Sequence, residues 1–325
     1  MVILPFFTLM KLQTKVPIVK QKNAIDYNSK LLLLGSCFVE NIGSKLIEHK
    51  FQTLKNPLGI FFHPQALADF LHRVATKTYF TEEDVFYHHE QWSCFEAHSS
   101  CNASTASKLV ITLNSAIDAT YAFITTATHV VFTLGTAWVY EFQDTQKVVV
   151  NCHKQPKQKF IKRLLSVVEI ETALEKCLAS CLKLNDSLSC IATISPVRHE
   201  KDGLVANQRS KAHLCTALHS VIDKNNEVMG YFPAYEIVMD ELRDYRFYSE
   251  DMLHPNQQAV NYIWQQFSAA YFSAATEKTV QRVHEVNLGL AHRPFNAESE
   301  AYVKFKAALS VKIKALQQEY PFITF

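Results

Sequence analysis

Short runs of continuous apolar residues, most of them followed by a helical pattern, constrain the fold of this 325-residue chain more than any other feature. The predicted strands are Leu31–Leu34, Phe51–Leu54, His129–Leu134, Ser189–Ile194 and Tyr231–Val238. Continuous rather than alternating apolarity is typical of parallel strands that helices cover on both faces. We therefore predict an α/β fold with a mainly parallel five-stranded sheet.

The segments between these strands favour helices and two inserted hairpins. Helical patterns cover 162–184, 208–224, 255–274 and 299–319, and apolar arms around polar turns predict hairpins over 85–95 and 138–150. After Ala275 the chain becomes polar and then helical. We predict one main domain over 10–275 and a helical C-terminal extension over 276–325 that packs on it.

Charge and hydropathy argue against several classes of protein. The 33 basic and 31 acidic residues give a net charge of only +2, which is not typical of a nucleic-acid surface or a polybasic membrane patch. No apolar stretch approaches the roughly 20 residues of a membrane helix. Residues 1–9 lack a basic region and a cleavage site, so Met10 is the expected start and a cytoplasmic location is predicted.

Candidate site residues follow from a rule for open parallel sheets, in which ligands bind at the carboxyl ends of the strands. The segments expected there, or in the loop before the last helix of the main domain, are Gly35–Cys37, Asn56–Gly59, Gly135–Ala137, Ser195–His199 and Asp251–Pro255. The eight Cys residues show no spacing typical of a disulfide framework, and several lie in or next to apolar segments, where a free Cys behaves as a small hydrophobe.

Ser36 and Cys37 stand between a Leu-rich strand and an amphipathic helix. A thiol at a helix N-terminus can have a depressed pKa, which makes a thiolate nucleophile available at neutral pH. The structural interpretation is that Ser36 caps the helix and Cys37 packs in the core. Residue type alone leaves both interpretations open.

Asp251 and His254 lie three residues apart, before Pro255 at the expected start of a helix. At this spacing the carboxylate can hold one imidazole tautomer while the other ring nitrogen accepts a proton from a nucleophile. The alternative is a surface Asp that caps the helix beside a partly exposed His. Combined with Ser36 or Cys37, the pair supplies every member of a catalytic triad.

Arg198 and His199 follow a predicted strand end and are expected to face the same cleft. Arg198 can recognise an anionic or sugar-hydroxyl group through its planar fork of donors, or it can form a salt bridge to Glu200 or Asp202. The His and Cys residues of the first insertion lack the paired spacing of a zinc site, so neither a metal nor a cofactor is expected.

Several motifs resemble those of the GSCFA family. They include Gly35-Ser36-Cys37-Phe38, Asn56–Ile60, Thr133–Trp138, Asn151–Lys154, Ser195–His199, Leu242–Tyr248 and Asp251–Pro255, and the resemblance covers roughly Met10 to the end. That family is grouped with the SGNH (GDSL-like) hydrolases. The resemblance implies a three-layer α/β/α sandwich, flavodoxin-like in outline, and a Ser-His-Asp site that acts on esters.

The SGNH pattern fits this chain at one point and departs from it at two. Asp251 and His254 match the Asp-x-x-His-Pro block, whereas the third position of the Gly-Asp-Ser turn is Cys37, so Cys37 is preferred over Ser36 as nucleophile. The oxyanion Asn of Gly-x-Asn is missing, because Gly135-Thr136 is followed by Ala137. The N–H groups of Cys37 and Gly59 remain, with side-chain donors from Thr136 or Asn56.

These observations predict a cofactor-free hydrolase that acts on an ester or O-acyl group of a small molecule or glycan. Cys37 or Ser36 attacks, His254 is the general base, and Asp251 orients it. The alternatives are an acyltransferase and a non-catalytic glycan- or metabolite-binding protein on the same scaffold. No nucleic-acid or membrane partner is expected, and the oligomeric state is left open.

Overall fold

Five parallel strands form the central sheet of the computed structural model, which describes residues 13–325. They are β1 (Lys30–Gly35), β2 (Gln52–Lys55), β5 (His129–Leu134), β9 (Ser189–Ile194) and β10 (Met229–Tyr231), in the order β10-β9-β5-β1-β2. The predicted α/β class and sheet are confirmed. The predictions made for residues 1–9 and for a start at Met10 lie outside the described residues.

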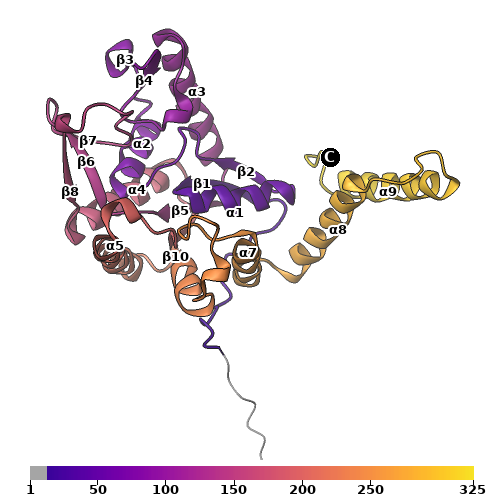
Figure 1. Ribbon diagram of the computed structural model, residues 1–325. Coiled ribbons are helices and arrows are strands. Elements are labelled where there is room, and N and C mark those ends of the chain that lie inside the picture. The colour runs from indigo at the N-terminus through magenta and orange to yellow at the C-terminus, as the bar shows by residue number, and fades with distance from the viewer. Residues whose placement is uncertain (1–12) are drawn as a thin grey trace, which may run out of the picture.

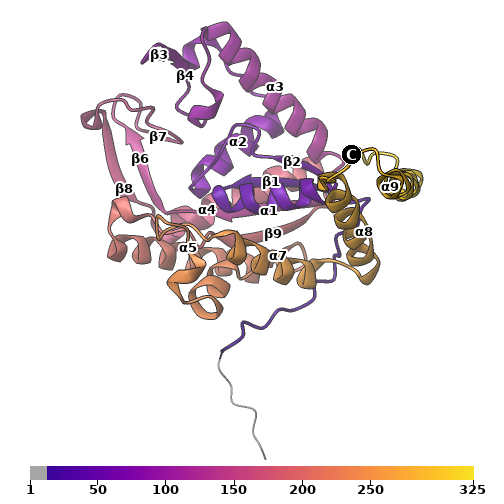
Figure 2. The same ribbon diagram turned by 45° about the vertical axis from the view of Figure 1, so that its right-hand side comes forward.

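Helices cover both faces of this sheet and make it a three-layer α/β/α sandwich (Figures 1 and 2). The helices that pack it are α1 (Cys37–Glu48), α2 (Pro64–Thr76), α3 (Ala106–Ile124), α4 (Val167–Leu184), α5 (Leu204–Lys224) and α7 (Gln257–Tyr271). Side chains alternate along a strand. In β1, Leu32 and Leu34 pack with α2 to α5, while Leu31 and Leu33 pack with α1 and α7.

Two predicted boundaries were wrong. The last strand does not run to Val238, because it stops at Tyr231 and the chain turns at Pro233 into α6 (Ala234–Glu236) and a π-helical turn, Ile237–Glu241. A proline has no N–H with which to continue a strand ladder. The helix predicted from residue 162 begins at Val167, after a capping box formed by Ser166 and Glu169.

Both predicted hairpins are confirmed. The first pairs β3 (Phe86–His88) with β4 (Gln91–Ser93) through His89 and Glu90, which both have positive φ angles. The second pairs β6 (Trp138–Phe142) with β7 (Lys147–Val149). β8 (Phe160–Leu164) adds a third strand to the second hairpin. This strand was not predicted, because residues 162–164 were assigned to a helix.

The C-terminal part of the chain contains α8 (Ala274–Ala291) and α9 (Glu300–Glu319). Only the second of these was predicted. Figures 1 and 2 show the two helices extending to one side of the body. Val283, Val286 and Leu316 are nevertheless buried in the same core as α1 and α7. Within residues 13–325, no helix combines the length and hydrophobicity needed to cross a bilayer.

The chain order of the strands places a topological switch point between β1 and β5. From β1 the chain moves to β2 on one side of the sheet and later returns to β5 on the other side of β1. The connection after β1 runs to one face of the sheet and the connection after β5 runs to the other face. A crevice opens between them at the carboxyl ends of the two strands, and this is where ligands bind in open α/β sheets. Gly35–Cys37 and Gly135 lie at this point.

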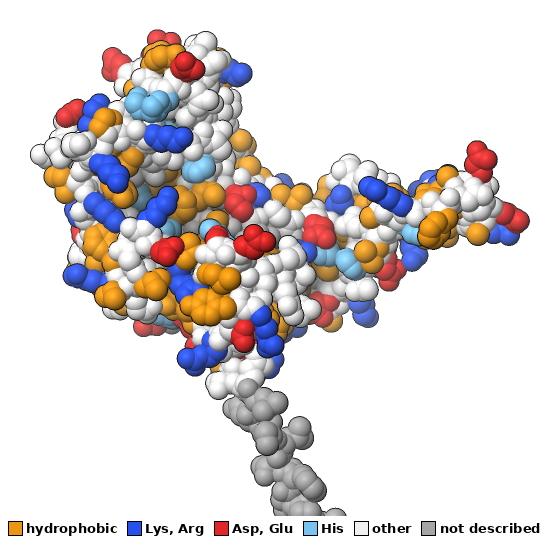
Figure 3. Space-filling view, in the orientation of Figure 1, with side chains coloured by type: hydrophobic (Ala, Val, Ile, Leu, Met, Phe, Trp, Pro, Cys, Tyr) orange, Lys and Arg blue, Asp and Glu red, His pale blue; other side chains and the backbone are white. Residues whose placement is uncertain are grey.

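Charged side chains of both signs are interspersed with apolar ones on the face of the body that Figure 3 shows. This distribution agrees with the small net charge of the chain, +2.

Candidate active site

Gly35 ends β1 in a conformation that requires glycine. Its φ angle is +139°, and a Cβ atom there would lie 2.2 Å from the carbonyl oxygen of Thr133 in β5. Around it, the N–H of Ser36 donates to that same carbonyl at 3.1 Å, and the N–H of Gly35 donates to Asn56 Oδ1 at 2.9 Å. β1 and β5 thus approach closely at the turn that leads into α1.

Ser36 occupies the N-cap position of α1, but its side chain makes no capping hydrogen bond. The residue is only 1% exposed, and Oγ is buried without a hydrogen-bond partner. Ser36 therefore stands at the predicted capping position, but its hydroxyl does not cap the helix. An unpartnered buried hydroxyl is uncommon in native proteins and calls for an explanation.

Cys37 is the first residue of α1 and is partly exposed. Burial raises the pKa of its thiol, whereas the nearby ammonium of Lys211 and the N–H groups of Cys37 and Phe38 act in the opposite direction. The expectation of a depressed pKa was wrong, because the desolvation of the sulfur outweighs the helix N-terminus. The thiol is protonated at neutral pH and needs a base before it can attack.

Lys211 of α5 is a member of the site that sequence reasoning missed. Its side chain is 1% exposed, and Nζ donates to the carbonyls of Gly135 and Ser195, each at 2.6 Å. Burial lowers the pKa of Lys211 to about 7, and the neighbouring Cys37 opposes that shift. A lysine inside an apolar helix pattern was the one available signal, because lysine is almost never fully buried without a partner.

Asp251 and His254 form the hydrogen-bonded pair that their spacing predicts. Nδ1 of His254 lies 2.6 Å from Asp251 Oδ2, and Asp251 Oδ1 accepts the N–H groups of Leu253 and His254 at 2.9 and 3.0 Å. These two N–H groups and the ring lower the pKa of Asp251 to about 2. The carboxylate is therefore ionised, and it leaves Nε2 of His254 as the nitrogen that can accept a proton.

Arg198 connects the end of β9 to the loop that carries His254. Its Nη2 donates to the carbonyl of Met252 at 2.8 Å, and its guanidinium lies 4.4 Å from the ring centroid of Tyr248. The salt bridge considered with Glu200 or Asp202 does not form, because the carboxylate of Asp202 pairs with Lys162. Arg198 therefore holds the loop that carries Asp251 and His254.

His199 lies between the two halves of the site. Its Nε2 is 3.5 Å from the point that a Cβ on Gly135 would occupy, and the Ser36 Cβ is 3.2 Å from the same point. Burial is the main cause that lowers the pKa of His199 to about 4, and nearby Lys211 and His254 act in the same direction. The ring is neutral and packs edge-on against Phe62, with centroids 5.8 Å apart.

The predicted oxyanion donors are mostly engaged within the protein. The N–H of Gly59 donates to the Asn56 carbonyl at 2.8 Å, and Nδ2 of Asn56 donates to Glu40 at 2.7 Å. The Thr136 hydroxyl contacts Ser210 Oγ at 3.1 Å and accepts from the N–H of Trp138 at 3.0 Å. The N–H groups of Cys37 and Phe38, in the first turn of α1, have no acceptor within the helix.

A cavity of about 980 Å³ lies elsewhere, between α2 and the two inserted hairpins. Its lining contains none of the predicted site residues, and includes Arg73, Glu96 and Arg163. A second cavity, of about 650 Å³, touches Asn56 and Gly59 from the side of the first hairpin. The candidate active site is therefore defined by hydrogen bonds and buried polar atoms, not by these cavities.

Comparison with known proteins assigns the chain to a family. The model of the GSCFA family matches residues 30–267, which contain every residue of the candidate site. The chain belongs to the GSCFA family. The C-terminal domain of GSCFA proteins matches residues 283–325, which hold the end of α8 and all of α9. The boundary predicted at residue 275 of this GSCFA chain stays a prediction.

Two solved structures resemble the GSCFA chain at low identity. A protein of Streptococcus pneumonia assigned provisionally as a platelet activating factor is 12% identical, with a TM-score of 0.39 over 74% of this chain and 83% of its own. A carbohydrate esterase of family 3 from Talaromyces cellulolyticus is 11% identical, with a TM-score of 0.36 over 79% of this chain and 99% of its own. Among curated proteins, none matches the chain.

Proposed function

We propose that this GSCFA protein hydrolyses an ester or O-acyl group through Cys37, His254 and Asp251. The observation that carries the proposal is the 2.6 Å contact between His254 Nδ1 and Asp251 Oδ2. It leaves Nε2 as the proton acceptor, in a loop whose Met252 carbonyl accepts a hydrogen bond from Arg198, a residue that follows the carboxyl end of β9. An imidazole fixed in this way is the general base of triad hydrolases.

The reaction proceeds in two halves. Sγ of Cys37 attacks the acyl carbonyl carbon while His254 Nε2 takes the thiol proton, and the alcohol leaves with that proton. Water then attacks the thioester, with His254 again as base, and releases the acid and the free thiol. The raised pKa of Cys37 makes this base necessary, because little thiolate is present at neutral pH.

Exposure favours Cys37 over Ser36 as the nucleophile. Cys37 is partly exposed, whereas Ser36 is 1% exposed with its Oγ enclosed. Lys211 adds to this preference, because its ammonium lies close enough to Cys37 to favour the thiolate. The N–H groups of Cys37 and Phe38 are the donors best suited to a developing oxyanion.

A carbohydrate ester is the substrate class that the rim of the site suits. Tyr245 is 62% exposed and lies beside Arg198, whose guanidinium is 5.4 Å from its ring centroid. An exposed aromatic ring presents an apolar face and a polar tip. Such a ring can stack on a sugar while the acyl group reaches Cys37.

The test is hydrolysis of a panel of p-nitrophenyl acyl esters and O-acetylated sugars by wild type and single variants. We expect Cys37→Ala and His254→Ala to lower kcat/KM at least about 10³-fold, as the loss of triad members does elsewhere. Ser36→Ala should retain activity. Cys152→Ala, which removes another partly exposed thiol, is the matched control.

Two results would overturn parts of the proposal. If Ser36→Ala is inactive and Cys37→Ala is active, Ser36 is the nucleophile. If folded wild type hydrolyses no member of the panel, hydrolysis is rejected. In that case the internal hydrogen bonds of Gly59, Asn56 and Thr136 favour a binding protein on the same scaffold. An alcohol acceptor in place of water would make the same site an acyltransferase.

A further inference from the structure

The C-terminal helix α8 packs against the end of α1. Asn287 Nδ2 of α8 donates to the carbonyl of Glu48, the last residue of α1, at 2.8 Å. Val283 and Val286 of α8 are fully buried in the core that also contains Leu46 of α1. This contact joins the part of the chain that the C-terminal family domain matches to the main body.

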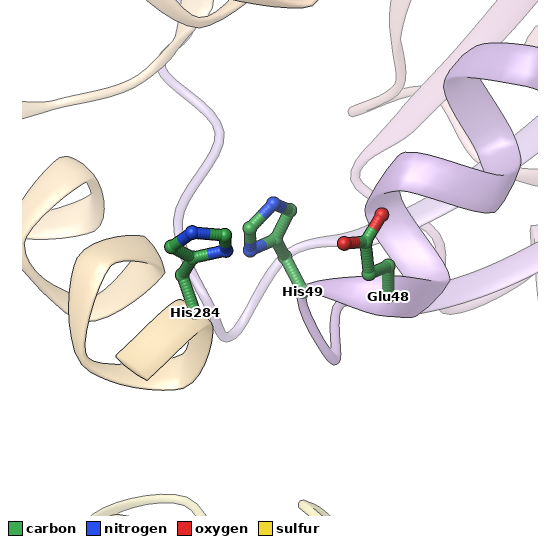
Figure 4. A group of neighbouring side chains, drawn as sticks. All are labelled: Glu48, His49 and His284. Carbon is green, nitrogen blue, oxygen red and sulfur yellow. The ribbon is translucent and has the colours of Figure 1, made fainter. Parts of the chain in front are cut away.

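Three side chains converge at this contact. Glu48 and His49 come from the end of α1, and His284 comes from α8 (Figure 4). One possible ligand atom from each lies within 4.8 Å of the other two. Figure 4 shows the imidazole of His49 between the imidazole of His284 and the carboxylate of Glu48.

His49 carries an unexplained polar atom into this cluster. The residue is 5% exposed, and its Nδ1 is buried without a hydrogen-bond partner. Leaving a buried donor or acceptor unpaired destabilises the folded state. The ring is held in place by stacking on Trp264, with centroids 5.4 Å apart and planes 2° from parallel. A fixed imidazole with an unused nitrogen is suited to ligate a metal.

The charges around His49 agree with that role. Burial lowers the pKa of His49 to about 4, so the ring is neutral and its lone pair is available near neutral pH. Glu48 opposes this shift, while His284 and Lys45 add to it. Lys45 holds Glu48 Oε2 at 3.0 Å, which leaves Oε1 without a partner among the described residues.

A backbone carbonyl completes the arrangement. The backbone of Val280 in α8 lies close enough to the His49 ring to raise the pKa of that ring. Histidines that bind metals usually donate their second nitrogen to a carbonyl or carboxylate.

We propose that Glu48, His49 and His284 bind a zinc ion, with water as fourth ligand, and that this ion fastens α8 to the end of α1. A site with two imidazoles and one carboxylate binds zinc in preference to harder cations. Bonds of about 2.0–2.1 Å to a tetrahedral ion separate ligand atoms by about 3.4 Å. Exposed Glu48 and partly exposed His284 can close that distance by side-chain rotation.

This proposal departs from the expectation that the chain has no metal site. His49 and His284 are far apart in the sequence and neither stands in a spaced motif, so the cluster exists only after α8 packs on α1. Zinc at one hundred times its Kd would stabilise the packed state by about 2.7 kcal/mol. The bound ion would reduce opening of the C-terminal helices.

The test is zinc binding by the full chain after removal of metals with a chelator. We expect one zinc ion per chain by competition with a chromophoric chelator, and an affinity at least tenfold lower in His49→Ala and His284→Ala. His292→Ala is the matched control, because His292 is an exposed histidine that follows α8 directly. Zinc should also slow hydrogen exchange of residues 274–291 in wild type but not in His284→Ala.

Because the chain has eight Cys residues, Co²⁺ replaces zinc in a second measurement. We expect a spectrum of nitrogen and oxygen ligands without a thiolate charge-transfer band. Binding of unchanged affinity in folded His284→Ala, thiolate bands, or no binding by folded wild type would each overturn the proposal. His284→Ala keeps the test decisive if His49→Ala misfolds, because His49 is buried and His284 is partly exposed. None of these readouts depends on ester hydrolysis.

Discussion

Three single residues, at a strand end, in a loop and within a helix, decide the geometry of the candidate site. Gly35 is required because β5 approaches closely. Asp251 is held by hydrogen bonds to two N–H groups and an imidazole, and Lys211 is held by hydrogen bonds to two carbonyls. Asp251 accepts backbone N–H groups, Lys211 donates to backbone carbonyls, and Gly35 leaves room for a backbone oxygen of β5. Substitutions at this scale therefore test how the turn and the loop are held.

Gly35→Ala should lower the free energy of unfolding by at least about 3 kcal/mol, because the new Cβ would meet a backbone oxygen in the neighbouring strand. Urea unfolding followed by circular dichroism measures the change. Gly230→Ala in β10 is the control, since its Cβ would meet only the flexible side chain of Gln21, at 3.3 Å. Equal effects of the two substitutions would contradict the steric explanation.

Arg198→Ala should loosen the loop that holds His254 and leave the fold intact. The lost hydrogen bond joins a charged group to a carbonyl, a class that contributes roughly 1.5–3 kcal/mol. Hydrogen exchange of residues 249–254 should become at least about tenfold faster. Arg209→Ala removes an exposed arginine of α5 and should change nothing in this loop. An unchanged exchange rate of residues 249–254 in Arg198→Ala would contradict the role of Arg198 in holding this loop.

Local signals at helix ends explain which elements could be predicted. α4 begins where Ser166 and Glu169 form a capping box, and α7 begins at an Asn256 cap, each just inside the range that periodicity suggested. α8 was missed because its segment is polar and few of its side chains are buried. Its position depends on contacts with α1, which no local pattern records.

Ser166→Ala should cost about 1 kcal/mol of stability, because it removes the hydroxyl that accepts the N–H of Glu169 at the start of α4. The comparison is Thr172→Ala, which removes an exposed hydroxyl bonded to the Val168 carbonyl within the same helix. That control should be neutral or slightly stabilising. Urea midpoints at one pH distinguish the two, and a larger loss in Thr172→Ala would refute the capping argument.

Several histidines other than the proposed zinc ligands are buried and neutral in the folded protein. Burial lowers the pKa of His63 and His199 to about 4, and it also lowers the pKa of His129 and His153. In the unfolded chain these rings bind protons near their ordinary pKa of about 6.5. Between about pH 4 and 6.5 the unfolded state therefore binds more protons than the folded state.

Stability should therefore rise with pH across this window and fall as the solution is acidified. We expect the free energy of unfolding, measured in urea with a chelator present, to be at least about 2 kcal/mol lower at pH 5 than at pH 7.5. His63→Asn, which retains a side-chain acceptor for the N–H of Ala66, should reduce this pH dependence. A stability that is flat over the window would contradict the assignment of neutral buried rings.

The sequence by itself determined the features that depend on neighbouring residues. These are the apolar runs of four strands, β1, β2, β5 and β9, the two hairpins, and the Asp251–His254 pair, whose members are close enough to meet within one turn. It also placed the candidate residues at the carboxyl edge of the sheet. This followed because a parallel sheet brings all such ends together.

Only the tertiary structure decided what those residues contact. It engaged the donors of Gly59 and Asn56 within the protein, placed Lys211 beside Cys37, and brought His284 to His49. These outcomes depend on contacts between segments that are distant in the chain and on the desolvation that packing imposes. Hydrophobic periodicity specifies which face of an element is buried, but not which polar atom meets another there.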